Sequence, residues 1–350
     1  MRAAVYRAAG NVTVEDVPDP SLQSAPEGSA TDAIVRVLRS CICGSDLWSW
    51  RGVIQRQPGS RLGHEFIGIV EEVGADVRTI AVGDLVVAPF QWSDGTCPAC
   101  LDGIHTRCEH GGTFGAPGTD GGQGEAVRVP EADGTLVVVP GGADESLYPA
   151  LLALSDVAGT GLHGAVLADV TEGSTVAVVG DGAVGLAAVL GARNVLGAER
   201  VILMSRHEDR AALGRAYGAT DVIAERGDEG IAAVRELTGG LGVRHVVEAV
   251  GTPESWAMSI GMARVGGTIG AVGVPHTSPQ LGIFQPFVQH LTLRFGIAPV
   301  RRYLPDLVER TLAGTYDAGA VFDLTLPLEQ VADGYRAMDE RRSIKTMLAG

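Results

Sequence analysis

A glycine-rich turn between a strand and a helix constrains the fold of this chain more than any other feature. Residues 176–189, VAVVGDGAVGLAAV, carry a GxGxxG pattern, whose turn residues are Gly180, Gly182, Ala183, Val184 and Gly185. The first glycine permits a tight turn, the second lets the backbone approach a pyrophosphate, and the third lets the following helix lie close to the sheet. The helix N-terminus then faces the phosphate charge. We expect these residues to bind a dinucleotide; the alternative is a glycine-rich packing turn in a sheet without a ligand.

Strand and helix patterns alternate around this turn, from about residue 173 to residue 297. The apolar strand-like runs are STVAVVG, RVILMS, DVIAE and HVVEAV, and helical stretches such as AVGLAAVLGARNVLG and DRAALGRAYG separate them. Strands that alternate with helices in this way build a parallel sheet with helices on both faces. GGTIGAVGV and LTLRFGI continue the sheet. Two helical stretches, about 305–313 and 328–340, then precede a last strand, SIKTMLA, which we expect to return to the first part of the chain.

The first 156 residues follow another pattern, in which Gly, Pro and Asp break up short apolar runs such as AIVRVLRS, EFIGIVEEVG and DLVVAPF. This pattern predicts a mainly antiparallel β domain. Because a chain of 350 residues exceeds the size at which one hydrophobic core keeps growing, two domains are expected. Residues 1–157 and 298–350 are assigned to the β domain and residues 158–297 to the parallel-sheet domain, so the fold class is α/β.

Charge and cysteine usage narrow the class of protein further. Forty-two acidic residues against 27 basic ones give a net charge of -15, which repels nucleic acid and anionic membrane surfaces. The sequence has neither a run of about 18 uninterrupted apolar residues nor a secretory pattern after Met1, so we expect a cytoplasmic protein with no membrane partner. An odd, clustered set of cysteines suits metal binding better than disulfides: Cys41, Cys43, Cys97, Cys100 and Cys108.

The end of the strand after the glycine turn bears on the choice of cofactor. An acidic residue there would bind the ribose hydroxyls and repel a 2'-phosphate, but the sequence has none. It has instead a hydroxyl and three basic side chains, which are Ser205, Arg206, His207 and Arg210. These groups suit a phosphate, so the pattern favours NADP(H) over NAD(H). The alternative is a set of solvated residues at a helix start, with Glu208 and Asp209 diluting the positive charge.

Two groups of residues have the chemistry of metal ligands. Cys43 in CICGSD and His64 in RLGHEF are one thiol and one imidazole, although a lone Cys or His is more often a packing residue or a satisfied polar group. The long segment 91–124 is more specific, because it has Asp94, Cys97, Cys100 and Cys108. Two cysteines separated by two residues can grip a tetrahedral ion that the other two ligands close. The alternative is an empty loop with three reduced thiols.

Along essentially its whole length, the chain resembles the zinc-containing medium-chain dehydrogenases/reductases of the alcohol dehydrogenase type. The matching text is CGSD, GHEFIGIVEEVG, the cysteine loop, GGQGEAVRVP, LSDVAGTGLHGA and the glycine turn, in the family's order and spacing. The resemblance implies a GroES-like catalytic domain, a Rossmann domain inserted before the C-terminal return, and an active site in the cleft between them.

The resemblance also implies two zinc sites. The catalytic zinc would be held by Cys43, His64 and Asp156, with Glu65 as an intermittent fourth ligand and one position open for the substrate oxygen. For Asp156, the alternative is an acidic residue at a helix start. The structural zinc would be held by the residues of the cysteine loop, in which Asp94 stands where the family usually has a cysteine. Cys41 matches no ligand position and is expected to be a packing residue.

Other residues are assigned by the same resemblance. Ser45 matches a hydroxyl that bonds the substrate oxygen, the alternative being a turn-forming serine, and Asp46 would support the zinc ligands. Trp48 stands where many relatives continue the proton path with a histidine, so the path must use another group or water. Contacts with the nicotinamide, its carboxamide and the pyrophosphate are expected from Thr160, Val272, Gly273, Val274 and Lys345, the alternative being that each is an ordinary core or surface residue. Candidate substrate walls, which are as often core residues, are Trp48, Phe90, Trp92 and Phe114.

The expected activity is hydride transfer between an alcohol and an aldehyde or ketone, with NADP(H) and zinc. The alternatives are an NAD(H)-dependent polyol or sugar dehydrogenase of the same family and a non-catalytic nucleotide-binding relative. A zinc hydrolase with Glu65 as base is a further class, against which the lack of an HExxH helix argues. The expected partners are a small-molecule substrate and further copies of the chain, as a homodimer or homotetramer.

Overall fold

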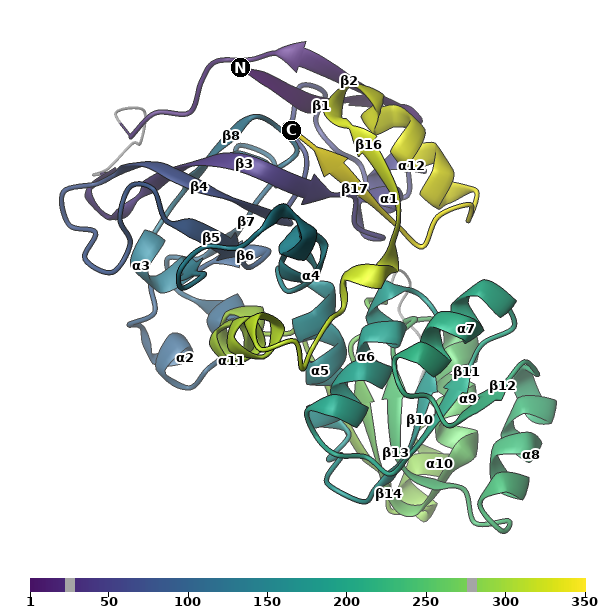
Figure 1. Cartoon of the computed structure of the whole chain (residues 1–350). Coiled ribbons are helices and arrows are strands. Elements are labelled where there is room, and N and C mark those ends of the chain that lie inside the picture. The colour runs from purple at the N-terminus through teal and green to yellow at the C-terminus, as the bar shows by residue number, and fades with distance from the viewer. Residues whose placement is uncertain (23–28, 276–281) are drawn as a thin grey trace. The chain divides into compact units, whose positions relative to one another are not determined.

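The computed structural model describes residues 1–22, 29–275 and 282–350. The chain divides into two compact units, which are drawn in Figure 1. The first unit consists of Met1–Asp156 and Pro299–Gly350, and the second consists of Val157–Ala298. The expectation that the C-terminal segment returns to the first unit is confirmed, because the last strand pairs with a strand from residues 33–41.

The first unit is built on a seven-stranded sheet in the order β16-β17-β3-β4-β5-β9, with β8 also paired to β3. All its neighbouring strands are antiparallel except β16 and β17, as the sequence predicts for a mainly antiparallel domain. The strands are β3 (Ala33–Cys41), β4 (Phe66–Val73), β5 (Leu85–Ala88), β8 (Ala126–Val129), β9 (Val137–Val138), β16 (Phe322–Pro327) and β17 (Lys345–Ala349). Two short ribbons accompany the sheet, β1 (Arg2–Ala8) with β2 (Asn11–Asp16), and β6 (Gln91–Trp92) with β7 (Gly112–Thr113).

Short helices connect these strands, and two longer ones lie in the C-terminal segment. They are α1 (Asp46–Trp50), α2 (Pro98–Leu101), α3 (Ala132–Thr135), α4 (Tyr148–Ala153), α11 (Val300–Leu312) and α12 (Val331–Asp339). The sequence prediction began the first C-terminal helix at residue 305, whereas α11 begins one turn earlier and contains Pro305. The buried face formed by Val300, Leu304, Leu307 and Val308 outweighs the hydrogen bond that the proline cannot make.

The second unit is a six-stranded, all-parallel sheet in the order β12-β11-β10-β13-β14-β15. In chain order this is the 3-2-1-4-5-6 arrangement of the Rossmann fold, with the reversal of strand order between β10 and β13. The strands are β10 (Thr175–Val179), β11 (Arg200–Met204), β12 (Asp221–Ile223), β13 (Val243–Glu248), β14 (Ala263–Ala271) and β15 (Thr292–Phe295). The predicted α/β class, with one mainly antiparallel β domain and one Rossmann domain, is confirmed.

Helices join the strands of this second sheet. They are α5 (Val157–Leu167), α6 (Ala183–Asn194), α7 (Glu208–Ala216), α8 (Gly227–Leu237), α9 (Pro253–Met262) and α10 (Phe284–Val288). Among the described residues one run, Glu145–Leu167, is long and apolar enough to cross a membrane by length and composition. Because 83% of its most apolar window is buried inside the structure, this run has the character of core helices rather than of a lipid-facing span.

Candidate active site

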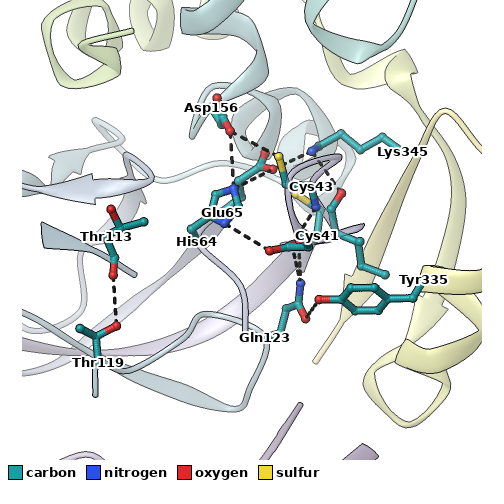
Figure 2. Close-up of polar contacts among 12 residues, drawn as sticks. Cys41, Cys43, His64, Glu65, Thr113, Thr119, Gln123, Asp156, Tyr335 and Lys345 are labelled. Carbon is teal, nitrogen blue, oxygen red and sulfur yellow. Dashed lines mark hydrogen bonds and ion pairs between the residues drawn. The ribbon is translucent and has the colours of Figure 1, made fainter. Parts of the chain in front are cut away.

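Four side chains with metal-binding chemistry converge in the first unit, as Figure 2 shows. Cys43 lies between β3 and α1, His64 and Glu65 precede β4, and Asp156 follows α4. One ligand atom from each lies within 4.8 Å of the others. The Asp156 Oδ2 atom is 3.7 Å from both the Cys43 Sγ and the His64 Nε2 atoms. The structure therefore brings together all four residues expected at the catalytic zinc.

These distances fit a tetrahedral zinc ion. Bond lengths of 2.0–2.3 Å give tetrahedron edges of roughly 3.3 to 3.8 Å between ligand atoms. Glu65 is fully buried, and its Oε2 atom has no hydrogen-bond partner in the described part of the chain. Burial raises the pKa of the Cys43 thiol, as expected for a site completed by a cation. A buried carboxylate oxygen beside a thiol, an imidazole and a second carboxylate is the donor set that a zinc ion satisfies.

Asp46 connects the candidate zinc ligands to the surrounding protein. Its Oδ2 atom accepts hydrogen bonds from the Cys43 amide at 3.0 Å and from Gln123 Nε2 at 3.4 Å. Its Oδ1 atom lies 3.6 Å from His64 Nδ1. Burial by itself lowers the pKa of His64, but Asp46, Cys43 and Asp156 together raise it well above its ordinary value. A carboxylate on the ring nitrogen that faces away from a metal orients the imidazole and makes it a stronger ligand.

Two further residues that the sequence pattern does not indicate extend this network. Gln123 Nε2 also donates to the Cys41 carbonyl oxygen at 3.0 Å, and Tyr335 Oη donates to Gln123 Oε1 at 3.1 Å. Tyr335 is buried and stacks on Trp50, so α12 supports the site from the C-terminal segment. Gln123 is a polar residue between glycines in GGQGEAV, which is the one local signal that could have marked it.

Lys345, which the resemblance assigns to the pyrophosphate, pairs with Glu65 in the described structure. Its Nζ atom lies 2.7 Å from Glu65 Oε1 and 3.3 Å from the Ile42 carbonyl oxygen, and the side chain is only 1% exposed. Burial lowers the pKa of this ammonium, but Cys41, Glu65, Cys43 and Asp156 together raise it well above its ordinary value. The described structure therefore uses this charge to neutralise a buried carboxylate beside the candidate zinc ligands (Figure 2).

The cysteine loop forms a second candidate metal centre. Ligand atoms of Asp94, Cys97, Cys100 and Cys108 all lie within 4.8 Å of one another. The Asp94 carboxylate accepts hydrogen bonds from the Thr96 and Cys97 amides, and its Oδ2 atom is 2.7 Å from Nδ1 of His110, which the sequence prediction omitted. Burial by itself raises the pKa of Asp94, but these contacts hold it well below its usual range. Asp94 therefore stays charged and close to three thiols, as a zinc site requires.

The glycine turn of the second unit has the geometry of a phosphate cradle. Gly180 has a φ of 120°, and a Cβ on Gly185 would lie 2.0 Å from the Gly180 carbonyl oxygen, so neither position admits a side chain. A Cβ on Gly182 would meet no described atom within 4 Å, which leaves room beside the backbone where α6 begins. Ala183 and Val184 form the first turn of α6, whose N-terminus attracts an anion.

Comparisons with known proteins agree with both units. A family model described as an alcohol dehydrogenase GroES-like domain matches residues 29–141, and one described as a zinc-binding dehydrogenase matches residues 183–311. Zinc-type alcohol dehydrogenase B of Aspergillus flavus is 32% identical over 355 residues, which cover 99% of this chain and 81% of that protein. A glutathione-independent formaldehyde dehydrogenase of Bacillus subtilis is 32% identical and is matched by 99% of this chain over 96% of its own length.

Solved structures agree with the sequence relatives. Alcohol dehydrogenase TADH from Thermus sp. ATN1 superposes with a TM-score of 0.91 at 34% identity, covering 100% of this chain and 99% of that one. The chain belongs to the zinc-type alcohol dehydrogenase family. It is thus an oxidoreductase of a family that uses Zn²⁺ and a nicotinamide cofactor on small-molecule alcohols.

The structure separates the expected substrate walls of this alcohol dehydrogenase family member into two groups. Phe90 contacts the edge of the His64 ring, with centroids 6.3 Å apart, and Trp48 is half-buried in α1, just after Cys43. The assignment of Phe114 to the substrate wall is wrong, because Phe114 is 2% exposed and packs against Phe66 in the core of the β domain. Trp92 packs on Phe114 and donates its indole N–H to a carbonyl oxygen of the cysteine loop, so it supports that loop.

The other residues expected to contact the substrate or the cofactor lie in helices or just after strands of the alcohol dehydrogenase fold. Ser45 is half-buried at the start of α1, and Thr160 is half-buried in α5. Val272, Gly273 and Val274 follow β14, where the Val272 and Gly273 amides donate to the Glu248 carbonyl oxygen. Ser205, Arg206 and His207 follow β11, and Arg210 lies in α7.

Proposed function

We propose that this protein interconverts an alcohol with its aldehyde or ketone, using a zinc ion held by Cys43, His64 and Asp156. The observation that carries the proposal is the convergence of one sulfur, one nitrogen and one carboxylate oxygen, with the carboxylate oxygen 3.7 Å from each of the other two atoms. When bound, the zinc ion polarises the substrate oxygen while the nicotinamide ring accepts or donates the hydride. One thiolate and one carboxylate balance the charge of the divalent ion.

The residues around the site divide the remaining work. Asp46 orients the His64 ring, and Lys345 engages the Oε1 atom of Glu65, so Cys43, His64 and Asp156 would be the constant zinc ligands and Glu65 an intermittent one. Ser45, two residues after Cys43, would hold the proton of the substrate oxygen. Trp48 lies where many relatives continue the proton path with a histidine, so the proton would leave through water or another group. Trp48 and Phe90 favour an apolar substrate.

The hydrolase alternative has no support from the site. A zinc hydrolase would use Glu65 as the base that activates water. The Glu65 carboxylate is instead fully buried, and its Oε1 atom is engaged by the Lys345 ammonium at 2.7 Å. A carboxylate in a buried ion pair is a poor proton acceptor, because protonation would leave the ammonium without its counter-charge.

For the cofactor we propose NADP(H) rather than NAD(H). The end of β11 has Ser205, Arg206 and His207 instead of an acidic residue, and Arg210 follows in α7. A related zinc-binding dehydrogenase from Sinorhizobium meliloti, solved bound to NADP, superposes with a TM-score of 0.81 at 27% identity. The NAD(H)-dependent polyol or sugar dehydrogenase is the alternative that a direct cofactor titration decides.

We further propose that the protein forms a homo-oligomer through the second unit. Strand β15 ends the order of the parallel sheet, and Phe284 and Phe287 in the preceding helix α10 and Phe295 in β15 itself are 77%, 76% and 68% exposed. Monomeric proteins seldom leave an apolar patch next to a free sheet edge. A second copy of the same strand would cover both the patch and the edge. The cytoplasmic location stays a prediction.

The zinc proposal is tested by comparing two cysteine variants. Absorbance of reduced cofactor is followed with a panel of alcohols and aldehydes for wild type, Cys43→Ser and the matched control Cys41→Ser. Cys41 lies two residues away, is buried, and belongs to neither candidate metal cluster. Cys43→Ser should lose one zinc ion per chain and nearly all turnover, while Cys41→Ser keeps both. Equal turnover of wild type and Cys43→Ser would refute the proposed zinc chemistry.

A further inference from the structure

Asp181, inside the glycine turn, contacts the groups assigned to the cofactor's 2'-phosphate. Ser205 donates its hydroxyl hydrogen bond to Asp181 Oδ2 at 2.8 Å. Arg210 Nη1 lies 3.6 Å from Asp181 Oδ1 and 3.5 Å from the Asp181 carbonyl oxygen. The Asp181 and Arg210 side chains are each 14% exposed. The Asp181 carboxylate, in the turn after β10, therefore already binds the Ser205 hydroxyl and the Arg210 guanidinium, which follow the end of β11.

A third arginine, Arg226, reaches the end of β11 from the turn that precedes α8. It precedes α8, and its Nη2 atom donates to the carbonyl oxygen of Met204, the last residue of β11, at 3.4 Å. Burial lowers the pKa of Arg226, Asp181 raises it, and the charge of Arg206 lowers it. Arg226 therefore lies within electrostatic range of both Asp181 and Arg206, which the sequence pattern did not indicate.

The charges of Asp181, Arg206, Arg210 and Arg226 together allow a phosphate to bind but weaken its binding. Arg210 contacts the Asp181 carboxylate, and Arg206 and Arg226 add two further positive charges near the end of β11, so an excess of positive charge suits a phosphate carrying roughly -1.5 to -2. The carboxylate competes with that phosphate for Ser205 and Arg210 and repels it directly. An unphosphorylated adenosine ribose meets no such repulsion, because its hydroxyls carry no charge.

We propose that Asp181 is a specificity-determining residue that weakens binding of the 2'-phosphorylated cofactor, and that Arg226 is the third arginine of the phosphate subsite. The inference rests on the proposed binding of NADP(H) and refines it. Asp181 holds Ser205 and Arg210 in position in the absence of phosphate, and Arg226 with the exposed Arg206 supplies the charge that admits it. The chain therefore binds both cofactors with a smaller preference than its arginines alone would give.

The test uses adenosine fragments, because they isolate this end of the cofactor. 2',5'-ADP and 5'-AMP are titrated calorimetrically into wild type, Asp181→Asn, Arg226→Gln and the control Asp209→Asn. Asp209 is an exposed acid in the first turn of α7, so its variant removes the same charge from outside the cluster. Asp181→Asn should tighten 2',5'-ADP about tenfold and Arg226→Gln should weaken it about tenfold, each leaving 5'-AMP within about threefold. Asp209→Asn should change neither fragment appreciably.

Ionic strength separates a charge effect from a change in the fold. The gain of Asp181→Asn should shrink at high salt, because the screening length is about 10 Å at 0.1 M and shorter above it. Asp181→Ser serves as a second variant if the asparagine variant melts early. An unchanged ratio of the two dissociation constants in folded Asp181 variants would overturn the proposal. So would a loss of 5'-AMP binding without a gain for 2',5'-ADP, which would make Asp181 a ribose ligand.

The same titration distinguishes the proposed role of Asp181 and Arg226 from the proposed preference for NADP(H). A wild type that binds 5'-AMP as tightly as 2',5'-ADP would refute the proposed preference for NADP(H). The change of that ratio on removing Asp181 or Arg226 tests the role of these two residues whichever fragment the wild type prefers.

Discussion

Lys345 is the only lysine in a chain whose other 26 basic residues, from a total of 27, are arginines. It is buried with Glu65 beside the candidate zinc ligands, where its ammonium also faces the Ile42 carbonyl oxygen. Two charges taken out of water are tolerated only when each neutralises the other. The pair therefore determines how much negative charge remains beside Cys43 and Asp156.

We expect Lys345→Met to destabilise the first unit strongly. The variant leaves the Glu65 carboxylate buried without its counter-charge, so the free energy of unfolding should fall by about 3–5 kcal/mol. Urea denaturation measures the change. The double variant Lys345→Met with Glu65→Gln should recover much of the loss, because it removes both charges. A single variant as stable as wild type would show that the ammonium does not compensate Glu65.

The same burial predicts the chemical reactivity of the chain. Lys345 is 1% exposed, so an amine-reactive reagent should leave it unmodified in the folded protein. In denaturant the reagent should modify it, and because the chain has no other lysine, the difference is a single adduct by intact mass. Complete modification of Lys345 under native conditions would contradict the buried ion pair.

A second charged pair, Arg200 with Asp221, joins neighbouring elements of the parallel sheet. Arg200, at the start of β11, donates two hydrogen bonds to Asp221, at the start of β12, at 2.8 and 2.9 Å. Arg200 also donates to the carbonyl oxygen of Leu237, the last residue of α8, at 2.8 Å. The hydrogen bond from Arg200 lowers the pKa of Asp221, and burial opposes it. Arg200 and Asp221 therefore link β11 to β12, and Arg200 also links β11 to the end of α8.

We expect Asp221→Asn to cost about 1 kcal/mol of unfolding free energy at neutral pH. The folded-state pKa of Asp221 lies below its unfolded value of about 3.9, so its contribution is complete above that value. The contribution is lost as the pH falls through the lowered pKa. Urea denaturation at neutral pH and near pH 3 measures the difference, which should shrink in acid. If the difference in unfolding free energy between wild type and Asp221→Asn grew in acid, the predicted lowering of the Asp221 pKa would be contradicted.

For the whole molecule, we expect the proposed assembly to form at β15, the last strand in the order of the parallel sheet. Among the described residues no strand pairs with the outer edge of β15, and Phe287 in α10 and Phe295 in β15 are exposed. Paired edges in a second copy would satisfy both at once.

The double variant Phe287→Glu with Phe295→Glu should shift the protein to a smaller assembly, because charges at the edge repel in a two-fold pair. Sedimentation velocity measures the change. Leu101→Glu is the matched control, since Leu101 is 75% exposed in α2 of the other unit. An unchanged sedimentation coefficient in the edge variant would place the interface elsewhere.

Features that depend on neighbours in the chain were predictable from the sequence. The glycine turn, the strand-helix alternation and the cysteine knuckle each rest on spacings of a few residues, and local geometry imposes them. The structure also places Cys43, His64 and Glu65 beside Asp156, which the resemblance had implied. The parallel strand β16 escaped prediction because it is a short edge strand whose register depends on β17.

Only the tertiary structure decided which distant side chains meet. Phe114 turned inward to the core, Lys345 reached Glu65, and Tyr335 came to support Gln123 from a helix more than two hundred residues away. The direction of a side chain depends on strand pairing and helix packing across the whole domain, which no local spacing encodes. The sequence by itself therefore determined the two folds and the chemical groups, whereas long-range pairing decided which partners those groups find.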